Sequence, residues 1–371
     1  MKSAFRAALL LAVGLGIGIW IGHRGPPAPQ PAAPEPAPVE TAAAPSPPRP
    51  ALACEAVASF HDNVYPSLVL SLGAAHPEYA RCLTLTIHHA PVGRPCEIRI
   101  ESSLFQEPFV TTASASSDTW ILTPDIPWNY AALRGFSQSQ PELFAISVAA
   151  GGRTVQTTLT CLVHSVNEAV SRVYDQDLAS WQDTSICYAA FVNEDHPWIN
   201  TLLQEAAARG GIERFAGYGL GPGAVVQQME AIWEALAARS LSYVDLATVS
   251  GGVSDVSTQY VRFLDQSVRD QGANCVDGAV LLASVFRRIG LRPVLMFRPG
   301  HCFIAVYDAP SGGQLMALET TLLSGAPFAA ALSYGAQELQ STLPNLGSPG
   351  FSEVDIALAR QQGVRPIGFE P

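Results

Sequence analysis

The chain has 371 residues and carries 32 Asp and Glu against 21 Lys and Arg, a formal net charge of −11 at pH 7. This acidic balance argues against nucleic-acid binding, because phosphate backbones are bound by basic surfaces. The length leaves room for two domains. No glycine-rich phosphate loop, zinc-type cysteine spacing or calcium-loop pattern occurs in it. We therefore expect neither a cofactor nor a metal ion.

An apolar stretch from Ala7 to Gly22 lies near the start, with Lys2 and Arg6 before it. It is somewhat short for a spanning helix of roughly 20 residues and long for the about 7–15 residues of a signal-peptide core. No small-x-small cleavage site directly follows. We predict a signal anchor over residues 1–24, with a transmembrane helix that binds the membrane through residues 7–22. The folded part would then lie outside the cytoplasm, in the periplasm or at the cell surface. The alternative is a cleaved signal peptide and a secreted protein.

Residues 25–51 are mostly Pro and Ala, the composition of a semi-rigid linker. Between 52 and 165, short alternating segments recur between turn signals, and Ser67–Leu72 is one of them. This spacing is typical of an antiparallel β-sandwich. Up to two disulfides are possible in an oxidising compartment, buried free thiols are equally compatible, and the pairing stays open. The cysteines concerned are Cys54, Cys82, Cys96 and Cys161.

Residues 166–221 form a bridging segment. We expect a short helix over Asn167–Tyr174 and a longer one that begins at Asp195-His196-Pro197, because a capping residue followed by Pro is typical of a helix start. Apolar residues at helical spacing predict another helix after residue 222 and a further one from Tyr260 to Val268.

A helix is predicted to begin at Cys275, because apolar residues then recur at three- and four-residue spacing. Gly290 and Pro293 mark its end. Asp277 falls in the first turn, where a negative charge suits the helix dipole. The dipole and the free backbone N–H groups at a helix start favour thiolate over thiol, and thiolate is the nucleophile. Cys275 is therefore our candidate nucleophile.

Three strands are predicted after this helix: Pro293–Phe297, His301–Tyr307 and Leu315–Thr321. His301 begins the second of them, and Glu319 lies on the third. A cysteine at a helix start, a histidine at the head of one strand and an acid on the next supply a nucleophile, a base and a residue that orients the base.

This combination resembles the core of the transglutaminase-like superfamily, a branch of the papain-like fold, over residues 222–325. The matching features are short and occur in the family's order: Asn274-Cys275, Gly290-Leu291-Arg292-Pro293, Gly300-His301 and Glu319-Thr320. Glu319 stands where the family usually has Asp. The resemblance implies a Cys275–His301–Glu319 triad, with Gln271 or Asn274 as the donor to an oxyanion.

We thus expect an α+β protein, an N-terminal antiparallel β-sandwich followed by a transglutaminase-like α+β domain. Residues 326–371 would form a helical tail with helices near Phe328–Leu339 and Ser352–Gln362. The expected activity is that of a cysteine hydrolase, a protease or amidase that forms a thioester with a peptide, protein or carboxamide substrate. The alternative is a catalytically inactive envelope protein that binds a protein or cell-wall partner. No oligomeric state is predicted.

Overall fold

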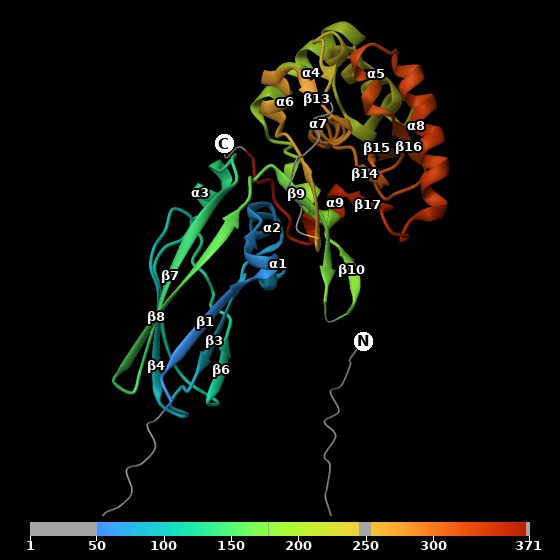
Figure 1. The fold of residues 1–371 in the computed structure, drawn as a ribbon. Helices are drawn as coiled ribbons and strands as arrows, with labels where there is room; N and C mark the ends of the chain where they lie inside the picture. Colours follow the sequence, from blue (N-terminus) through green and yellow to red (C-terminus); the bar gives the residue numbers. More distant parts are fainter. Residues whose placement is uncertain (1–49, 177, 245–253, 369–371) are drawn as a thin grey trace, which may run out of the picture. The chain divides into compact units, whose positions relative to one another are not determined.

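The computed structural model describes residues 50–176, 178–244 and 254–368 (Figure 1). Helices and several sheets with mostly antiparallel pairs occur in these ranges, so the predicted α+β class is confirmed at this level.

The first part of the described chain holds two sheets (Figure 1). They share one apolar core. Leu83, Leu85 and Ile87 of one sheet are buried with Ile98 and Phe144 of the other. One sheet has the order β1 (Ala53–Ala58), β3 (Leu83–His88), β6 (Thr119–Leu122). The other has the order β2 (Asn63–Val64), β8 (Arg153–Val163), β7 (Gln140–Ala150), β4 (Pro95–Ile100), β5 (Phe109–Ser114).

Most of the strand pairs in these two sheets are antiparallel, as alternation and turn spacing predicted. The longest pair, β7 with β8, is joined by Gly151 and Gly152, whose φ angles of 57° and 74° favour glycine. The exception is β2, which pairs with β8 in parallel.

Ser67–Leu72 is helical, so the predicted strand is wrong there. The helix is α2 (Pro66–Leu72), with Pro66 at its first turn, where the missing N–H costs nothing. The two serines of the alternating run are buried and satisfied: Ser67 donates to the Glu168 carbonyl and Ser71 to the Ser67 carbonyl. A contact 101 residues away thus stabilises a conformation that alternation alone does not indicate.

Asn167–Tyr174 was predicted as a short helix, and this prediction is also wrong. The segment is strand β9 (Glu168–Asp175), the middle strand of a sheet with β10 (Ser180–Asp183) and β12 (Val256–Tyr260). Val170 and Val173 are spaced as on a helix, but strand pairing with residues far along the chain decides their conformation.

The predicted helix from Ser352 to Gln362 begins later than expected. Ser352–Asp355 is strand β17, which pairs with β14 (Pro293–Arg298) and forms one edge of the sheet described next. Helix α9 (Ile356–Gln361) follows, and the Asp355 carboxylate caps it by accepting the N–H groups of Ala357 and Leu358.

The second half of the described chain centres on a four-stranded sheet with the order β16 (Leu315–Leu318), β15 (His301–Tyr307), β14 (Pro293–Arg298), β17. One face of β14 and β15 packs in the same apolar core as helix α7 (Cys275–Arg288). The opposite face packs with Leu339 of helix α8 (Phe328–Thr342). Burial on both faces explains why these two strands are apolar without alternation.

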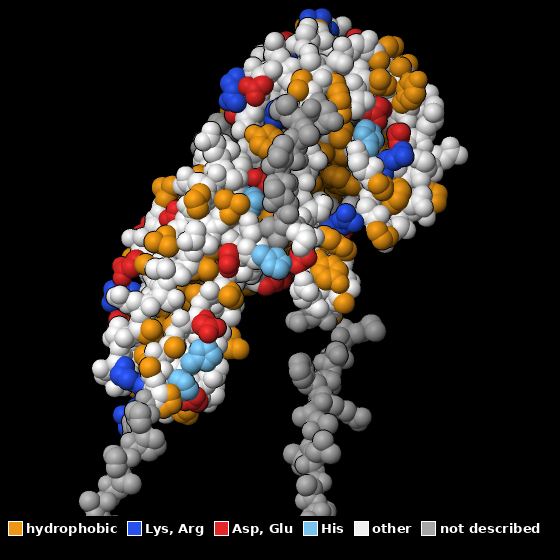
Figure 2. Space-filling model, in the orientation of Figure 1, with side chains coloured by type: hydrophobic (Ala, Val, Ile, Leu, Met, Phe, Trp, Pro, Cys, Tyr) orange, Lys and Arg blue, Asp and Glu red, His pale blue; other side chains and the backbone are white. Residues whose placement is uncertain are grey.

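The remaining elements surround these sheets. They are α1 (Ser59–Asp62), α3 (Tyr130–Gly135), α4 (Pro197–Gly210), α5 (Pro222–Ala237), β11 (Ser242–Tyr243), α6 (Leu264–Asp270) and β13 (Gly272–Ala273), with short 3-10 turns at Pro77–Tyr79, Ser185–Phe191, Gly217–Leu220, Thr320–Ser324 and Leu343–Asn345. On the face drawn in Figure 2, acidic and basic side chains are interspersed.

Helix α8 approaches β16 closely at Gly335. A Cβ atom at this position would overlap the backbone carbonyl of Ala317. One turn earlier, the Ala331 carbonyl accepts the Glu319 N–H at 3.0 Å. The helix therefore positions the segment that carries Glu319.

The Gly335→Ala variant is expected to be less stable than the wild type by about 1–3 kcal/mol, the usual cost of overpacking a closed contact. Urea unfolding measures the change. Gly223→Ala, at an open site on α5 where a Cβ meets nothing within 4 Å, is the control. Its expected effect is near zero or slightly stabilising. Equal stability of the two variants would contradict the close packing of α8.

Within residues 50–176, 178–244 and 254–368, no helix is both long and apolar enough to cross a membrane. This finding corrects three expectations from the sequence: a transmembrane or signal anchor, membrane contact through residues 7–22, and a location outside the cytoplasm. Residues 7–22 themselves lie outside the described residues.

Candidate active site

The start of α7 is held by a reciprocal cap and a buried ion pair. The Asn274 side chain accepts the Asp277 N–H at 2.8 Å, and the Asp277 carboxylate accepts the Asn274 N–H at 3.0 Å. Arg262 donates to the same carboxylate through its backbone N–H and its guanidinium, both at 2.7 Å. Burial raises the pKa of Asp277, although these hydrogen bonds act in the opposite direction. Cys275, between the two capping residues, thus has a well-defined position.

Cys275 is half-buried, whereas the other six cysteines, all within the described ranges, are buried. None of the seven forms a disulfide in this structure. Burial raises the pKa of Cys54 to about 11 and those of Cys82 and Cys161 to about 12. It raises the pKa values of Cys187 and Cys302 as well. A reagent that attacks thiolates is therefore expected to reach Cys275 first in the folded protein.

His301 stands at the first position of β15, directly after Gly300, whose φ of 72° favours glycine in the turn between β14 and β15. Its Nε2 atom lies 2.7 Å from the Glu319 carboxylate. The Cys275 thiol lies close enough to this ring to raise the pKa of His301. Because Nε2 is engaged by Glu319, we assign the other ring nitrogen, Nδ1, to the thiol. The structure brings together all three residues of the predicted triad.

Glu319 is buried at the end of β16, and both of its carboxylate oxygens are used. One contacts His301, and the other accepts the backbone N–H of Thr321 at 2.9 Å and its hydroxyl at 2.6 Å. Thr320 donates to the Cys275 carbonyl at 3.1 Å. The second residue of the Glu-Thr pair thus ties the acid-bearing segment directly to the start of α7.

The electrostatics of this cluster favour a charged imidazole. Hydrogen bonds to Cys275 and to Glu319 raise the pKa of His301 to about 10, against the opposing effect of burial. Burial pushes the pKa of Glu319 upward, but the hydrogen bonds from His301 and Thr321 bring it below its usual value. His301 is therefore an imidazolium, and Glu319 a carboxylate, at neutral pH.

The two amides predicted as oxyanion donors lie differently from each other. The Asn274 side chain belongs to the helix cap, and its NH₂ group donates to the Tyr260 carbonyl at 3.5 Å. Gln271 is exposed, with φ of 48°, at the end of α6, and it lines a cavity of about 340 Å³ with Trp198 and Leu241.

A different donor is available at the nucleophile itself. The cap of α7 engages the N–H groups of Asn274 and Asp277. Among the described residues, no acceptor bonds to the backbone N–H of Cys275. A free N–H at a helix start is a ready donor to developing negative charge.

Sequence reasoning did not identify Arg262 or Thr321 as supporting residues. Arg262 falls within the helix predicted from Tyr260 to Val268, where nothing in its neighbourhood distinguishes it from a surface arginine; in the structure it lies between β12 and α6. Thr321 follows directly after the recognised Glu-Thr pair, so its reach back to Glu319 could have been inferred from the preference of a strand-end acid for nearby N–H groups.

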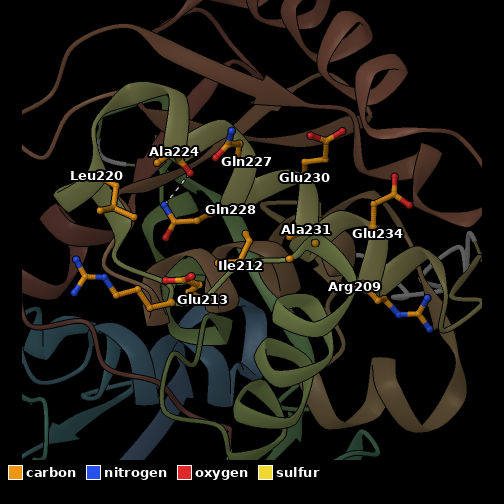
Figure 3. Close-up of a pocket in the computed structure, with 13 residues that line it drawn as sticks. Arg209, Ile212, Glu213, Leu220, Ala224, Gln227, Gln228, Glu230, Ala231 and Glu234 are labelled. Atoms are coloured by element: carbon orange, nitrogen blue, oxygen red, sulfur yellow. Dashed lines mark hydrogen bonds between the residues drawn. The ribbon is translucent and has the colours of Figure 1, made fainter.

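One of two further cavities borders the site. An open recess of about 430 Å³ is lined in part by His301 and Glu319. A larger cavity of about 980 Å³ lies between the end of α4 and α5, and none of its lining residues belongs to the triad (Figure 3). Among the described residues, no group of three or more His, Cys, Asp or Glu side chains is arranged to hold a metal ion.

The Glu319→Gln variant is expected to lower the pKa of His301, because a carboxylate that stabilises the imidazolium is lost. A histidine with a raised folded-state pKa adds stability that is fully present below its unfolded pKa, about 6.5, and is lost as pH rises through the folded value, about 10. The wild type should therefore lose this contribution gradually between these pH values. The variant should show a smaller loss, completed at lower pH. Thermal unfolding from pH 6 to 10 measures both, and identical curves would contradict the coupling of the two residues.

No protein-family model matches this chain, and no curated protein shows significant similarity to it. One solved structure with some likeness is described as that of "a putative protease" from Parabacteroides distasonis. It is 14% identical, the match covers 51% of this chain and 41% of that one, and the TM-score is 0.21. A likeness this slight carries no argument about function.

Proposed function

We propose that this protein is a cysteine hydrolase, a protease or amidase of transglutaminase-like type, which cleaves a peptide or carboxamide through a thioester on Cys275. The observation that carries the proposal is the placement of His301, whose ring contacts the Glu319 carboxylate at 2.7 Å and interacts with the nearby Cys275 thiol, which raises its pKa. The proposal includes an N-terminal β-sandwich followed by a transglutaminase-like core. Helix α7, packed on the β14–β15 hairpin whose second strand begins with His301, supports it.

In the first half of the reaction, the sulfur of Cys275 attacks the carbonyl carbon and a C–S bond forms. The carbonyl oxygen becomes negative and can accept the free Cys275 N–H. The C–N bond then breaks as His301 gives its ring proton to the leaving nitrogen. The products are an amine and a thioester. The charged state of His301 at neutral pH means that this proton is present before the reaction begins.

In the second half, water enters and His301, now neutral, takes one of its protons. The hydroxide oxygen attacks the thioester carbonyl, the C–S bond breaks, and the acid product leaves. The thiolate and the imidazolium are restored. Glu319 keeps the imidazole oriented in both halves and stabilises its charged form, while Thr321 fixes the carboxylate.

The test uses the full chain and a peptide mixture made by digesting a denatured protein. Acid quenching followed by mass spectrometry should find an acyl group on Cys275 and new peptide termini. Cys275→Ala should abolish both, and His301→Ala should lower the cleavage rate by about 10²- to 10⁴-fold, the range for general acid–base catalysis. Cys302→Ala, which removes a buried neighbouring thiol, should retain cleavage. If acylation and cleavage are absent from the wild type, or survive in Cys275→Ala, the proposal is wrong.

A further inference from the structure

The recess beside the triad borders the imidazole side of the site. Its walls include His301 and Glu319 but not Cys275. Arg298 and Pro299 form one border, at the end of β14, while Tyr334 of α8 forms another. A group bound there would lie against the histidine and the acid and away from the sulfur.

The chemistry of acyl transfer indicates which part of a substrate would occupy this recess. The acyl carbon becomes bonded to the sulfur of Cys275, whereas the leaving nitrogen must come within hydrogen-bond reach of the imidazole that protonates it. Substrate atoms beyond that nitrogen therefore extend past His301, on the side where the recess opens. This step rests on the proposed function.

The charges of the recess are paired within its own walls. Arg298 forms an ion pair with Glu338, and His301 forms one with Glu319. A charged ligand group entering the recess would lose hydration without finding an unpaired counter-charge, which is costly. A neutral group suffers no such loss.

Apolar surface is available between the two ion pairs. Tyr334 has 55% of its surface exposed, and Leu322 and Pro299 are further wall residues. Tyr334 precedes Gly335, the residue at which α8 is seated on β16, so its position relative to Glu319 is well defined. An aromatic ring held in this way can stack on an apolar side chain.

We infer that this recess binds the leaving-group residue of the substrate and selects an uncharged apolar or aromatic side chain there, with Tyr334 as the specificity-determining residue. The substrate class is thus a peptide in which the residue released as the amine carries a neutral, apolar side chain.

The experiment measures how amino-acid amides, which correspond to the released amine, slow the alkylation of Cys275 by iodoacetamide at pH 8.5. Phenylalaninamide should slow alkylation at least threefold at saturation. Isoglutamine and lysinamide, with charged side chains, should need at least fivefold higher concentrations for the same effect. Tyr334→Ala should weaken protection by phenylalaninamide at least fivefold, and Tyr334→Phe should restore it. Tyr130→Ala, at an exposed tyrosine of α3, is the control and should leave protection unchanged.

The outcomes separate the two proposals. Fast alkylation that phenylalaninamide does not slow, or slows equally in Tyr334→Ala, overturns the inference about the recess. Equal protection by the charged amides overturns its selectivity. Alkylation as slow as that of the denatured chain, together with protection that depends on Tyr334, contradicts the catalytic proposal and retains the recess as a ligand site. Slow alkylation without protection contradicts both.

Discussion

The His301→Ala variant is expected to react with iodoacetamide at Cys275 about 10- to 100-fold more slowly than the wild type at pH 6. A free cysteine, with a pKa of about 8.5, is less than about 1% thiolate at this pH. The raised pKa of His301 places a positive charge beside the sulfur of Cys275 at this pH. The gain in rate is smaller than the gain in thiolate, because a stabilised thiolate is a weaker nucleophile. Mass spectrometry of the labelled site over time gives the rate.

His89→Ala is the matched control for this measurement, because His89 is a partly exposed histidine paired with Asp118 in the first half of the chain. It should label at the wild-type rate. A His301→Ala variant that labels as fast as this control would show that the imidazole does not activate the thiol. The catalytic proposal would then be untenable.

The Asp277→Ala variant is expected to lose about 3–5 kcal/mol of unfolding free energy, because it leaves the guanidinium of Arg262 buried without its partner. The pair is almost fully buried, with side chains 7% and 0% exposed. The change also removes the acceptor of the Asn274 N–H and thereby loosens the helix start that carries Cys275. Urea unfolding gives the free energy, and iodoacetamide labelling reports the position of the thiol.

A double replacement separates the loss of the pair from the burial of a lone charge. Arg262→Leu with Asp277→Leu should recover most of the lost stability, since replacing both members of a buried pair is often close to neutral. If Asp277→Ala costs less than about 1 kcal/mol, the ion pair does not hold the helix start. If the double variant regains stability but still labels slowly, the cap formed by Asp277 is needed to position Cys275 independently of its effect on stability.

The parts of the fold that local signals specify could be predicted from the sequence. Helix α7 begins at Cys275 because Asn274 and Asp277 cap it, and the strands after it are recognisable as apolar runs separated by Pro299-Gly300. The order of nucleophile, base and acid along these elements was predicted on the same signals. The structure brings the three side chains together, with His301 bonded to Glu319 and close to the Cys275 thiol.

The failures lie where distant contacts decide the local structure. Ser67–Leu72 alternates as a strand does, but the buried serines bond to backbone carbonyls and the segment is helical. The segment at 168–175 has helical spacing but pairs with β12, whose residues lie more than 80 positions later. Neither partner can be identified from a short window of sequence.

In the candidate site as well, features that depend on contacts between distant residues could not be predicted from local sequence signals. Asn274 was predicted as an oxyanion donor because it precedes Cys275, but that position is also the helix cap, and the cap uses its side chain. Arg262 neutralises Asp277 from an adjoining element that no spacing rule connects to it. The close approach of Thr320 to Gly278 that brings Glu319 beside the helix start depends on packing in three dimensions.

The pH dependence of Cys275 alkylation in the wild type tests the central claim most directly. If the charged His301 activates Cys275, the rate should change less than about threefold between pH 6 and 9, because the pKa of His301 lies near 10 and its positive charge stays beside the sulfur throughout this range. An ordinary thiol would instead label about tenfold faster per pH unit until pH approaches about 8.5. A level profile supports an activated nucleophile, and the rising profile of an ordinary thiol would contradict it.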